Sequence, residues 1–370
     1  TSAVEIDDKS VLITEVKWVG DDSILAKVTD RSSDVLSVIL VDASNDASFK
    51  TVRVNPSEGG WWEITHNTLF VPKDVSRDRE NDGYLDIMPI DGYNHLVYFS
   101  PANSTEPLIL TEGAWEVVDG PAAFDSETNN VYFLATKKSS MERHVYSVNI
   151  NEPLKVSEVT DISKDGNYQI SFSSGNRFAL LTYKGPDVPY QKIVDFKSDE
   201  SDETVTGNIV GKTLYYLEEN KELKARLESY AIPSISYQEL NLGRDENGKD
   251  IIANSYTILP NDFDSSLKNY YPVFFYAYGG PNSQQVLKSF SVGFNQVVAS
   301  QLNALVVVVD GRGTGFKGKA FRSLVRDNLG DYEAQDQIAA AKLFGKKPFV
   351  DAEKISLFGW SYGGYLTLKT

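Results

Sequence analysis

Residues 355–365 read ISLFGWSYGGY, in which a short apolar run leads into a G-x-S-x-G pentad centred on Ser361. The apolar run predicts a strand, and residues 362–368 predict a helix. A serine on such a tight turn presents its hydroxyl at the edge of the sheet. Small residues must stand two before and two after it, because the turn crowds the backbone. Gly359 and Gly363 occupy these places, so the pattern is typical of a nucleophile elbow with Ser361 as the nucleophile.

The sequence before the elbow alternates between strand and helix patterns. Residues 251–259 and 273–278 read as strands, and residues 304–309 (ALVVVV) predict a strand buried on both faces. Residues 331–344 predict a helix. Strands separated by helices favour a mainly parallel, doubly wound sheet. We therefore expect the N-terminal part of an α/β-hydrolase domain over residues 241–370, truncated after the elbow.

The first part of the chain has an all-β pattern. Short runs rich in Val, Ile, Leu, Tyr and Phe occur at 23–29, 35–41, 95–100, 131–136, 144–150, 178–183 and 213–218. Pairs such as Asp91-Gly92 between them suit hairpin turns. Irregular four-stranded blades of a β-propeller fit this spacing, with a β-sandwich as the alternative. Residues 241–250 are polar and contain glycine, which is typical of the segment between two domains. We therefore place the domain boundary there and expect the C-terminal part of a β-propeller over residues 1–240.

The composition restricts the partners. The 370 residues carry a formal net charge of -16, which argues against nucleic acid, because phosphate binding needs clustered Lys and Arg. The sequence contains no cysteine, so disulfides and thiolate metal sites are excluded. No apolar run of about 18 residues occurs, and residues 1–9 are acidic without an apolar signal core. We expect a soluble chain, or one whose targeting segment lies elsewhere, and neither a metal nor a cofactor.

One glycine-rich stretch imitates a nucleotide site. Residues 313–318 (GTGFKG) match G-x-G-x-x-G and follow a strong strand. A P-loop needs Ser or Thr after its lysine to hold magnesium, but Ala320 stands there. A dinucleotide fingerprint belongs in the first strand-to-helix turn, whereas at least one strand precedes this one. We interpret the stretch as a loop that shapes a hydrolase cleft.

Three polar stretches carry weaker signals. Residues 78–83 (DRENDG) echo a calcium loop, but Pro89 stands at the twelfth position, where a bidentate Glu belongs. We interpret them as a solvated loop, and residues 199–203 (DESDE) as an exposed acidic turn. Asn103 begins an N-x-S/T sequon and is the expected glycosylation site if the protein passes through the secretory pathway.

A tyrosine and a backbone group are candidates for the oxyanion hole. Tyr278 ends the predicted strand 273–278 and precedes Gly279-Gly280-Pro281, where elbow hydrolases carry an oxyanion loop. Its hydroxyl could supply one donor, and the backbone N–H of Tyr362 the other. Two such donors stabilise the charge that develops on the carbonyl oxygen. The alternative is that Tyr278 is only a strand-end aromatic.

The sequence offers no clear general base for Ser361. The three histidines, His66, His95 and His144, all precede Ser361 and lie in the all-β part. Elbow hydrolases place the acid and then the histidine after the serine. We therefore interpret His95 and His144 as structural or surface residues. We expect the chain to be a fragment that is inactive by itself, because it lacks a base.

Four motifs occur together: YGGP at 278–281, DGRGTG at 310–315, GDYEAQDQ at 330–337 and GWSYGGY at 359–365. In combination they resemble the dipeptidyl peptidase IV branch of the prolyl oligopeptidase family, and above all its fungal dipeptidyl aminopeptidases. Residues 111–117 (TEGAWEV) resemble a propeller stretch of the same family.

The resemblance implies a β-propeller capping an α/β-hydrolase domain, and a serine exopeptidase that releases N-terminal dipeptides ending in Pro or Ala through an acyl-enzyme. Residue by residue, Ser361 matches the nucleophile and Tyr278 the oxyanion hydroxyl. Tyr362 matches the oxyanion N–H and part of the pocket wall. The family's catalytic Asp and His would fall beyond Thr370, and its amine-binding glutamate pair upstream of Thr1.

The resemblance also implies partners and a location. The expected partners are peptides with Pro or Ala at the second position, and a homodimer is among the expected assemblies. A single N-terminal membrane helix is expected outside this chain. The complete protein is then expected on the lumenal side of the vacuole or Golgi membrane, with secretion as the alternative.

Two other functions fit the same residues. An oligopeptidase or acylaminoacyl peptidase would share the architecture but lack the glutamate pair. A non-catalytic propeller scaffold that binds a protein partner belongs to a different class, and the intact Ser361 argues against it.

Overall fold

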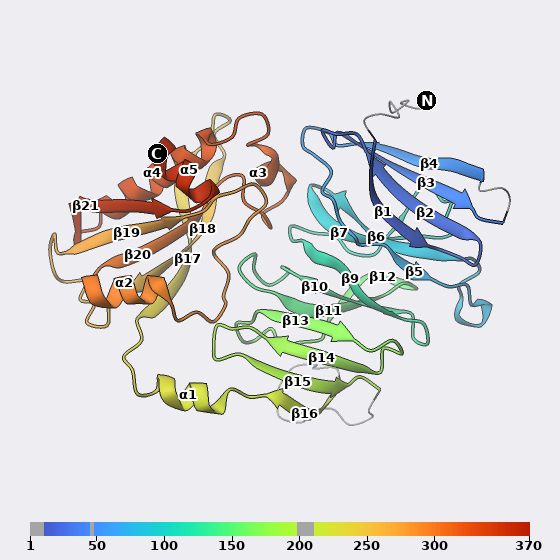
Figure 1. The fold of residues 1–370 in the computed structure, drawn as a ribbon, viewed down its shortest axis with the longest axis horizontal. Helices are drawn as coiled ribbons and strands as arrows, with labels where there is room; N and C mark the ends of the chain where they lie inside the picture. Colours follow the sequence, from blue (N-terminus) through green and yellow to red (C-terminus); the bar gives the residue numbers. More distant parts are fainter. Residues whose placement is uncertain (1–10, 45–47, 198–210) are drawn as a thin grey trace.

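The computed structural model describes residues 11–44, 48–197 and 211–370. Within them, four four-stranded sheets precede one five-stranded sheet with helices. Figure 1 shows the four sheets following one another in chain order, beside the part that holds the fifth. The expected acidic turn at 199–203 and the acidic residues 1–9 lie outside the described residues.

Each of the four sheets is an antiparallel meander of consecutive strands, and we call these sheets blades 1 to 4. Blade 1 holds β1 (Leu12–Trp18), β2 (Ser23–Thr29), β3 (Val35–Asp42) and β4 (Ser48–Pro56). Blade 2 holds β5 (Leu69–Val71), β6 (Gly83–Ile90), β7 (Tyr93–Phe99) and β8 (Leu108–Ile109), with the 3-10 helix η1 (Val75–Arg77). Blade 3 holds β9 (Val117–Asp125), β10 (Asn130–Ala135), β11 (His144–Asn149) and β12 (Glu152–Glu158). Blade 4 holds β13 (Tyr168–Phe172), β14 (Phe178–Tyr183), β15 (Tyr190–Asp195) and β16 (Lys212–Glu218).

Neighbouring blades are joined by shared apolar cores. Leu96 of blade 2 belongs to the same buried cluster as Phe133 of blade 3, and Tyr132 of blade 3 shares a cluster with Leu181 of blade 4. Alternate residues of a strand point to opposite faces, so a blade can pack against a neighbour on each side. The expected partial propeller is confirmed, and the sandwich alternative is not, because every blade pairs its strands in sequence order.

The fifth sheet has the strand order β17-β18-β20-β19-β21. Strands β19, β20 and β21 run parallel, while β17 and β18 pair antiparallel. The strands are β17 (Ser234–Arg244), β18 (Asp250–Leu259), β19 (Tyr271–Ala277), β20 (Leu305–Asp310) and β21 (Val350–Gly359). The helices are α1 (Lys221–Leu227), α2 (Phe294–Leu302), α3 (Lys319–Ser323), α4 (Asp331–Gly345) and α5 (Tyr362–Lys369). The strand and helix patterns expected before the elbow are therefore present.

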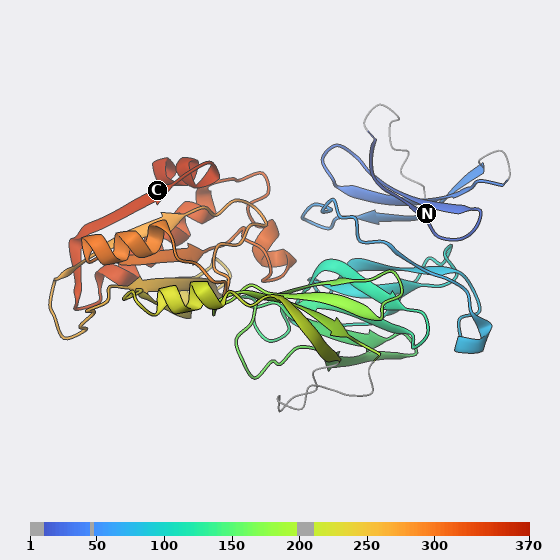
Figure 2. The same ribbon diagram turned by 60° about the horizontal axis from the view of Figure 1, so that its bottom comes forward.

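Helices cover both faces of this sheet (Figure 2). Val306 of β20 packs with Val298 of α2, while Val307 packs on the opposite side with Phe344 of α4. All six residues of β20 are buried for this reason, as the run ALVVVV predicted. The α/β-hydrolase part is confirmed, and its core fixes the strand ends that carry the candidate site.

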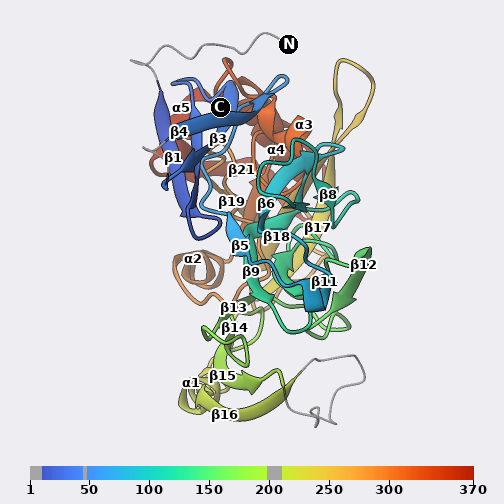
Figure 3. The ribbon, with the colours of Figure 1, turned by 90° about the vertical axis from the view of Figure 1, so that its right-hand side faces the viewer.

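The division between the two parts differs from the expected one. The expected boundary after residue 240 falls inside β17, which pairs along its length with β18 of the fifth sheet. Figures 1 and 3 show α1 beside β15 and β16, between the last blade and β17. We therefore propose to place the division in segment 219–233. The alternation of β17 resembles that of a blade strand, and only its pairing assigns it to the hydrolase part.

Buried charges join the two parts near α3. Glu116, which is 1% exposed, follows blade 2 and accepts a hydrogen bond of 2.8 Å from the backbone N–H of Gly318. Arg322 of α3 lies 2.9 Å from the Glu63 carboxylate and 3.5 Å from that of Glu116. Burial raises the pKa of Glu116, and the charge of Arg322 opposes this effect. These contacts hold the propeller and the hydrolase part together.

Candidate active site

The turn between β21 and α5 holds Ser361 in a strained conformation. Ser361 has φ 55° and ψ -126° and is exposed, directly before the first residue of α5. A serine with a positive φ is uncommon outside sites where the surrounding structure enforces it. The predicted strand, turn and helix are therefore present, and the turn presents the serine at the end of β21, which lies at the edge of the fifth sheet beside β19.

The flanking glycines are required by close backbone contacts. A Cβ atom on Gly359 would lie 2.2 Å from the carbonyl oxygen of Gly363, and one on Gly363 would lie 2.1 Å from that of Ala277. Neither contact leaves room for a methyl group. Gly364 is different, because its nearest neighbour would lie at 3.4 Å, an ordinary contact distance. The crowding expected from the pentad thus applies to Gly359 and Gly363.

The neighbouring parallel strand brings Tyr278 to the elbow. Ala277 of β19 is paired with Gly359 of β21, so Tyr278 leaves its strand beside the turn. The rings of Tyr278 and Trp360 lie 6.4 Å apart between centroids. Parallel strands end at the same edge of a sheet, and this places residues that are far apart in sequence on one site. The structure therefore brings Tyr278, Ser361 and Tyr362 together.

Tyr362 is held by a residue that the sequence did not reveal. Its hydroxyl donates a hydrogen bond of 2.6 Å to Glu333 of α4, a carboxylate that is 2% exposed. Burial, together with the hydrogen bond to Glu333 and its charge, raises the pKa of the Tyr362 hydroxyl. The other Glu333 oxygen accepts the N–H of Gly330 at 2.9 Å and so caps α4. The motif GDYEAQDQ contains Glu333, but its partner lies 29 residues away in sequence.

The glycine-rich loop after β20 fastens α4 to the sheet. Arg312 forms a buried ion pair of 2.6 Å with Asp336 of α4 and lies over the ring of Tyr332. A Cβ on Gly311 would lie 2.8 Å from Asp336, and one on Gly313, which has φ +96°, would lie 2.7 Å from Val325. The glycines of this loop thus allow it to pack closely against Asp336 of α4 and against Val325.

Two of the histidines are structural, as expected. His95 and His144 are fully buried, and each has its Nδ1 atom next to a threonine hydroxyl sixteen residues later, Thr111 or Thr160. His66 is exposed and lines a cavity of about 440 Å³ between the propeller and the α3 region.

Other expected features are placed without a catalytic contact. Asn103 is exposed in the loop between β7 and β8, where a glycan could attach. In the stretch 78–83, Arg79 is buried and donates to the carbonyl of Pro72 at 2.8 Å, while its neighbours are largely exposed. In the described ranges no cluster of His, Asp or Glu suits a metal ion, and no helix is long and apolar enough to span a membrane.

The fold and the site define a class of protein: an α/β-hydrolase domain with a serine elbow, joined to a β-propeller. Residues 1–190 match the profile of the dipeptidyl peptidase IV N-terminal region, and residues 289–370 match that of the prolyl oligopeptidase family. The chain therefore belongs to the dipeptidyl peptidase IV branch of that family, which confirms the resemblance seen in the motifs.

Named relatives agree with this assignment. Dipeptidyl aminopeptidase B of Saccharomyces cerevisiae is 65% identical over 363 residues, which cover 98% of this chain and 44% of the relative. Dipeptidyl-aminopeptidase B of Aspergillus niger is 44% identical over 368 residues, covering 99% of this chain and 39% of the relative. The chain thus spans less than half the length of these relatives. The crystal structure of Porphyromonas gingivalis dipeptidyl peptidase 4 has the same fold, with a TM-score of 0.80 at 24% identity over 99% of this chain and 47% of that one.

Proposed function

We propose that this chain is part of a serine exopeptidase that removes N-terminal X-Pro or X-Ala dipeptides from peptides. The main support is Ser361, held at a positive φ in the elbow and flanked by Tyr278. The names of the relatives, dipeptidyl aminopeptidases, agree with this substrate class. A propeller set against the site is consistent with selection of short peptides.

In the proposed mechanism, the Ser361 Oγ attacks the carbonyl carbon after the second residue of the peptide. A histidine supplied by the remainder of the full-length protein takes the Ser361 proton and passes it to the leaving amine. The Tyr278 hydroxyl and the Tyr362 N–H stabilise the oxyanion. Water then hydrolyses the dipeptidyl ester and frees the serine. The 370 residues alone are proposed to be inactive, because His95 and His144 are engaged within the propeller and His66 lines the cavity beside α3, a cavity whose lining residues do not include Ser361.

The substrate class is tested by comparing two chromogenic peptides with the full-length protein. We expect release of the chromophore from Ala-Pro-p-nitroanilide, and none from its N-acetylated form, because an exopeptidase must recognise a free amine. Faster cleavage of the acetylated form would replace the proposal by an acylaminoacyl peptidase or an oligopeptidase. No cleavage of either, together with no labelling by a fluorophosphonate probe, would favour the binding scaffold.

The Tyr278→Phe change tests the oxyanion hydroxyl. Loss of one preorganised donor should lower kcat by about a hundredfold, with little change in KM. The phenyl ring keeps the contact with Trp360, so the thermal unfolding midpoint should stay close to that of the wild type. Tyr270→Phe is the matched control, because Tyr270 directly precedes the opposite end of β19 and its hydroxyl accepts, among the described residues, only a long hydrogen bond of 3.5 Å from the side chain of Asn303, so kcat should be unchanged. Equal rates for Tyr278→Phe and wild type would assign Tyr278 to packing alone.

Assembly and location follow from the same proposal. We propose that the full-length protein faces the lumen of the vacuole or Golgi through a membrane anchor outside these residues, that Asn103 carries a glycan, and that a homodimer is the assembled form. The exposed position of Asn103 in the loop between β7 and β8 supports the glycan.

A further inference from the structure

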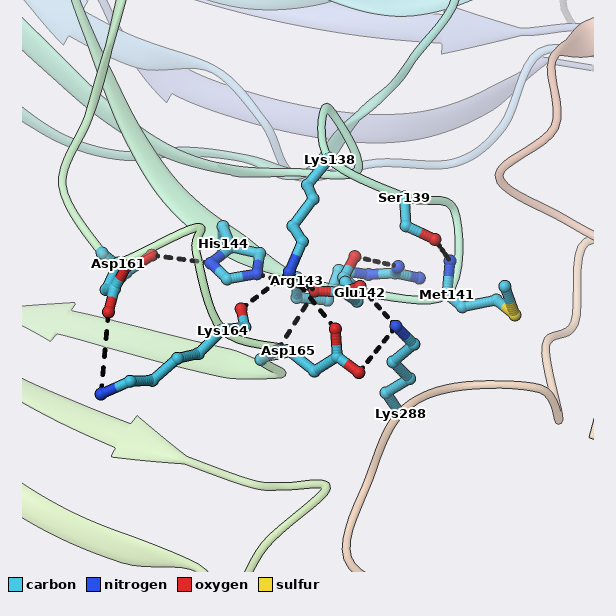
Figure 4. A network of polar contacts seen from close by, with 12 residues as sticks. Lys138, Ser139, Met141, Glu142, Arg143, His144, Asp161, Lys164, Asp165 and Lys288 are labelled. Atoms are coloured by element: carbon cyan, nitrogen blue, oxygen red, sulfur yellow. Dashed lines mark hydrogen bonds and ion pairs between the residues drawn. The ribbon is translucent and has the colours of Figure 1, made fainter. Parts of the chain in front are cut away.

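A buried carboxylate of blade 3 is shared between the propeller and the hydrolase part (Figure 4). Glu142, which is 1% exposed, accepts a hydrogen bond of 2.8 Å from Lys288, a residue of the segment that follows Tyr278. Its other oxygen lies 3.0 Å from Lys138 and accepts the N–H of Gly166 at 3.2 Å. Lys288 also pairs with Asp165 at 2.9 Å. The group contains two lysines and two carboxylates, so its charges balance.

A histidine orients this carboxylate. The Nε2–H of His144 donates to Glu142 at 3.0 Å, because an ionised carboxylate can only accept. The Nδ1 atom of His144 then accepts from the hydroxyl of Thr160, whose oxygen accepts the N–H of Val145. With a neutral imidazole, every polar atom in this series of hydrogen bonds, from Glu142 to the N–H of Val145, has a partner. Burial opposes ionisation of Glu142, but hydrogen bonds from His144, Lys288 and Lys138 hold its pKa below the usual range.

Blade 2 contains the same histidine and threonine pair without the carboxylate. His95 contacts the hydroxyl of Thr111, which accepts the N–H of Leu96, as Thr160 does for Val145. The Nε2–H of His95, however, donates to the carbonyl of Gly113 within the propeller. The histidine and threonine pair alone is therefore sufficient to join neighbouring segments within a blade. Only in blade 3 does it end on a charged group that reaches the hydrolase part.

The segment 282–290, which we call the linker segment, is fastened on both sides. On the propeller side, Gln284 donates to the carbonyl of Ser140 at 2.8 Å, and the N–H of Lys288 donates to that of Met141 at 2.9 Å. On the hydrolase side, the N–H groups of Gln285 and Val286 donate to the Asp310 carboxylate at 2.9 and 2.7 Å. Burial raises the pKa of Asp310 to about 7, and these two hydrogen bonds oppose the rise.

The linker segment begins close to the oxyanion tyrosine. Tyr278, Gly279, Gly280 and Pro281 are all that separate it from β19. A Cβ on Gly280 would lie 2.9 Å from the ring of Tyr278, so the backbone of the loop packs against that ring. The backbone conformation of this loop therefore determines the position of the Tyr278 hydroxyl.

We propose that Glu142 and Lys288 are positioning residues, which fix the linker segment between the two parts and thereby align the Tyr278 hydroxyl with the oxyanion. The inference rests on the proposed function, because Tyr278 is the group through which the pair acts. A displacement of the order of 1 Å in a catalytic group can cost about a hundredfold in rate.

A double-mutant cycle in the full-length protein tests this coupling. Lys288→Met removes the link but leaves Glu142 paired with Lys138 and His144, so the protein should fold. We expect kcat to fall about tenfold with KM changed less than about twofold, because the oxyanion hole acts in the transition state. In the Tyr278→Phe background the same change should lower kcat less than about twofold, because the group it positions is already absent. Lys288→Arg should restore most of the rate.

Lys317 provides a matched control. Its side chain is 14% exposed and pairs with Glu239 of β17 within the hydrolase part, whereas Lys288 is 15% exposed and pairs across the two parts. Lys317→Met should leave kcat unchanged. An equal fall for both lysine variants, or an equal fall for Lys288→Met with and without Tyr278, would overturn the inference.

The remaining outcomes are also decisive. If Lys288→Met does not fold, Asp165→Asn removes a half-exposed partner of the same lysine and enters the same cycle, with a smaller expected fall in kcat and the same dependence on Tyr278. If the wild type cleaves Ala-Pro-p-nitroanilide but the effects are additive, only the positioning role fails. If the wild type cleaves neither peptide, the proposed function and this inference fail together.

Discussion

Ser361→Ala in the full-length protein should lower kcat for Ala-Pro-p-nitroanilide by about 10⁴-fold or more, because no other group can form the acyl-enzyme. The oxyanion donors and the substrate contacts remain, so KM should change little. Covalent labelling by a fluorophosphonate probe should disappear completely. Far-ultraviolet circular dichroism and the unfolding midpoint should match the wild type, since an exposed hydroxyl is removed.

Ser356→Ala is the control for this prediction. Ser356 lies on the same strand β21, and its hydroxyl makes only a long contact of 3.4 Å with the carbonyl of Val273. Its replacement should leave turnover and labelling unchanged. Retained turnover by Ser361→Ala, or probe attachment at another residue in a peptide map, would remove Ser361 from the role of nucleophile.

Gly363→Ala should destabilise the protein and abolish turnover, although alanine favours helices over glycine by about 1 kcal/mol. The new methyl group would lie 2.1 Å from the carbonyl oxygen of Ala277, which is backbone of a central strand and cannot move aside. Overpacking of this kind costs about 3 kcal/mol or more, so the clash outweighs the helix preference. Displacing Ala277 would also displace Tyr278, and the oxyanion donor would be lost.

Gly364→Ala separates the clash from helix propensity. Gly364 is the next residue of the same helix, but its built Cβ would lie 3.4 Å from the nearest atom. This variant should be as stable as the wild type or slightly more so. The two variants are compared by urea unfolding of the full-length protein, monitored by tryptophan fluorescence, and by turnover of the chromogenic peptide. Equal stability of both variants would contradict the close backbone contact at the elbow.

Much of the fold was predictable, because its signals are local. The apolar run 304–309 predicted a strand buried on both faces, and Asp91-Gly92 predicted a hairpin turn that the structure forms with positive φ at both residues. Helix α2 (Phe294–Leu302) was not predicted, because it has only nine residues and its N-cap residue, Gly293, has no side chain to mark the start of a helix in the sequence. The boundary expected after residue 240 falls inside β17, which alternates like a blade strand and is assigned to the fifth sheet only by its pairing with β18.

The candidate site also contains residues that the sequence indicated and residues that it did not. Ser361 and its glycines were evident because a tight turn needs small residues at fixed short spacing, and Tyr278 was indicated by its place at a strand end. Glu333, Glu142 and Lys288 were not found, because their partners are distant along the chain: 29 residues for Glu333 with Tyr362, and 146 for Glu142 with Lys288. A charged residue in a polar stretch has no local feature that separates a buried hydrogen-bonded role from an exposed one.

By itself the sequence determined the elbow, the alternation of strands and helices, and the all-β character of the first part, because each depends on steric and hydrophobic patterns within a few residues. The tertiary structure alone decided which charges are buried, where the two parts meet, and that the loop behind Tyr278 is fastened to both of them. Those features arise when distant segments exclude water from a shared space, where a carboxylate such as Glu142 must find donors from several elements.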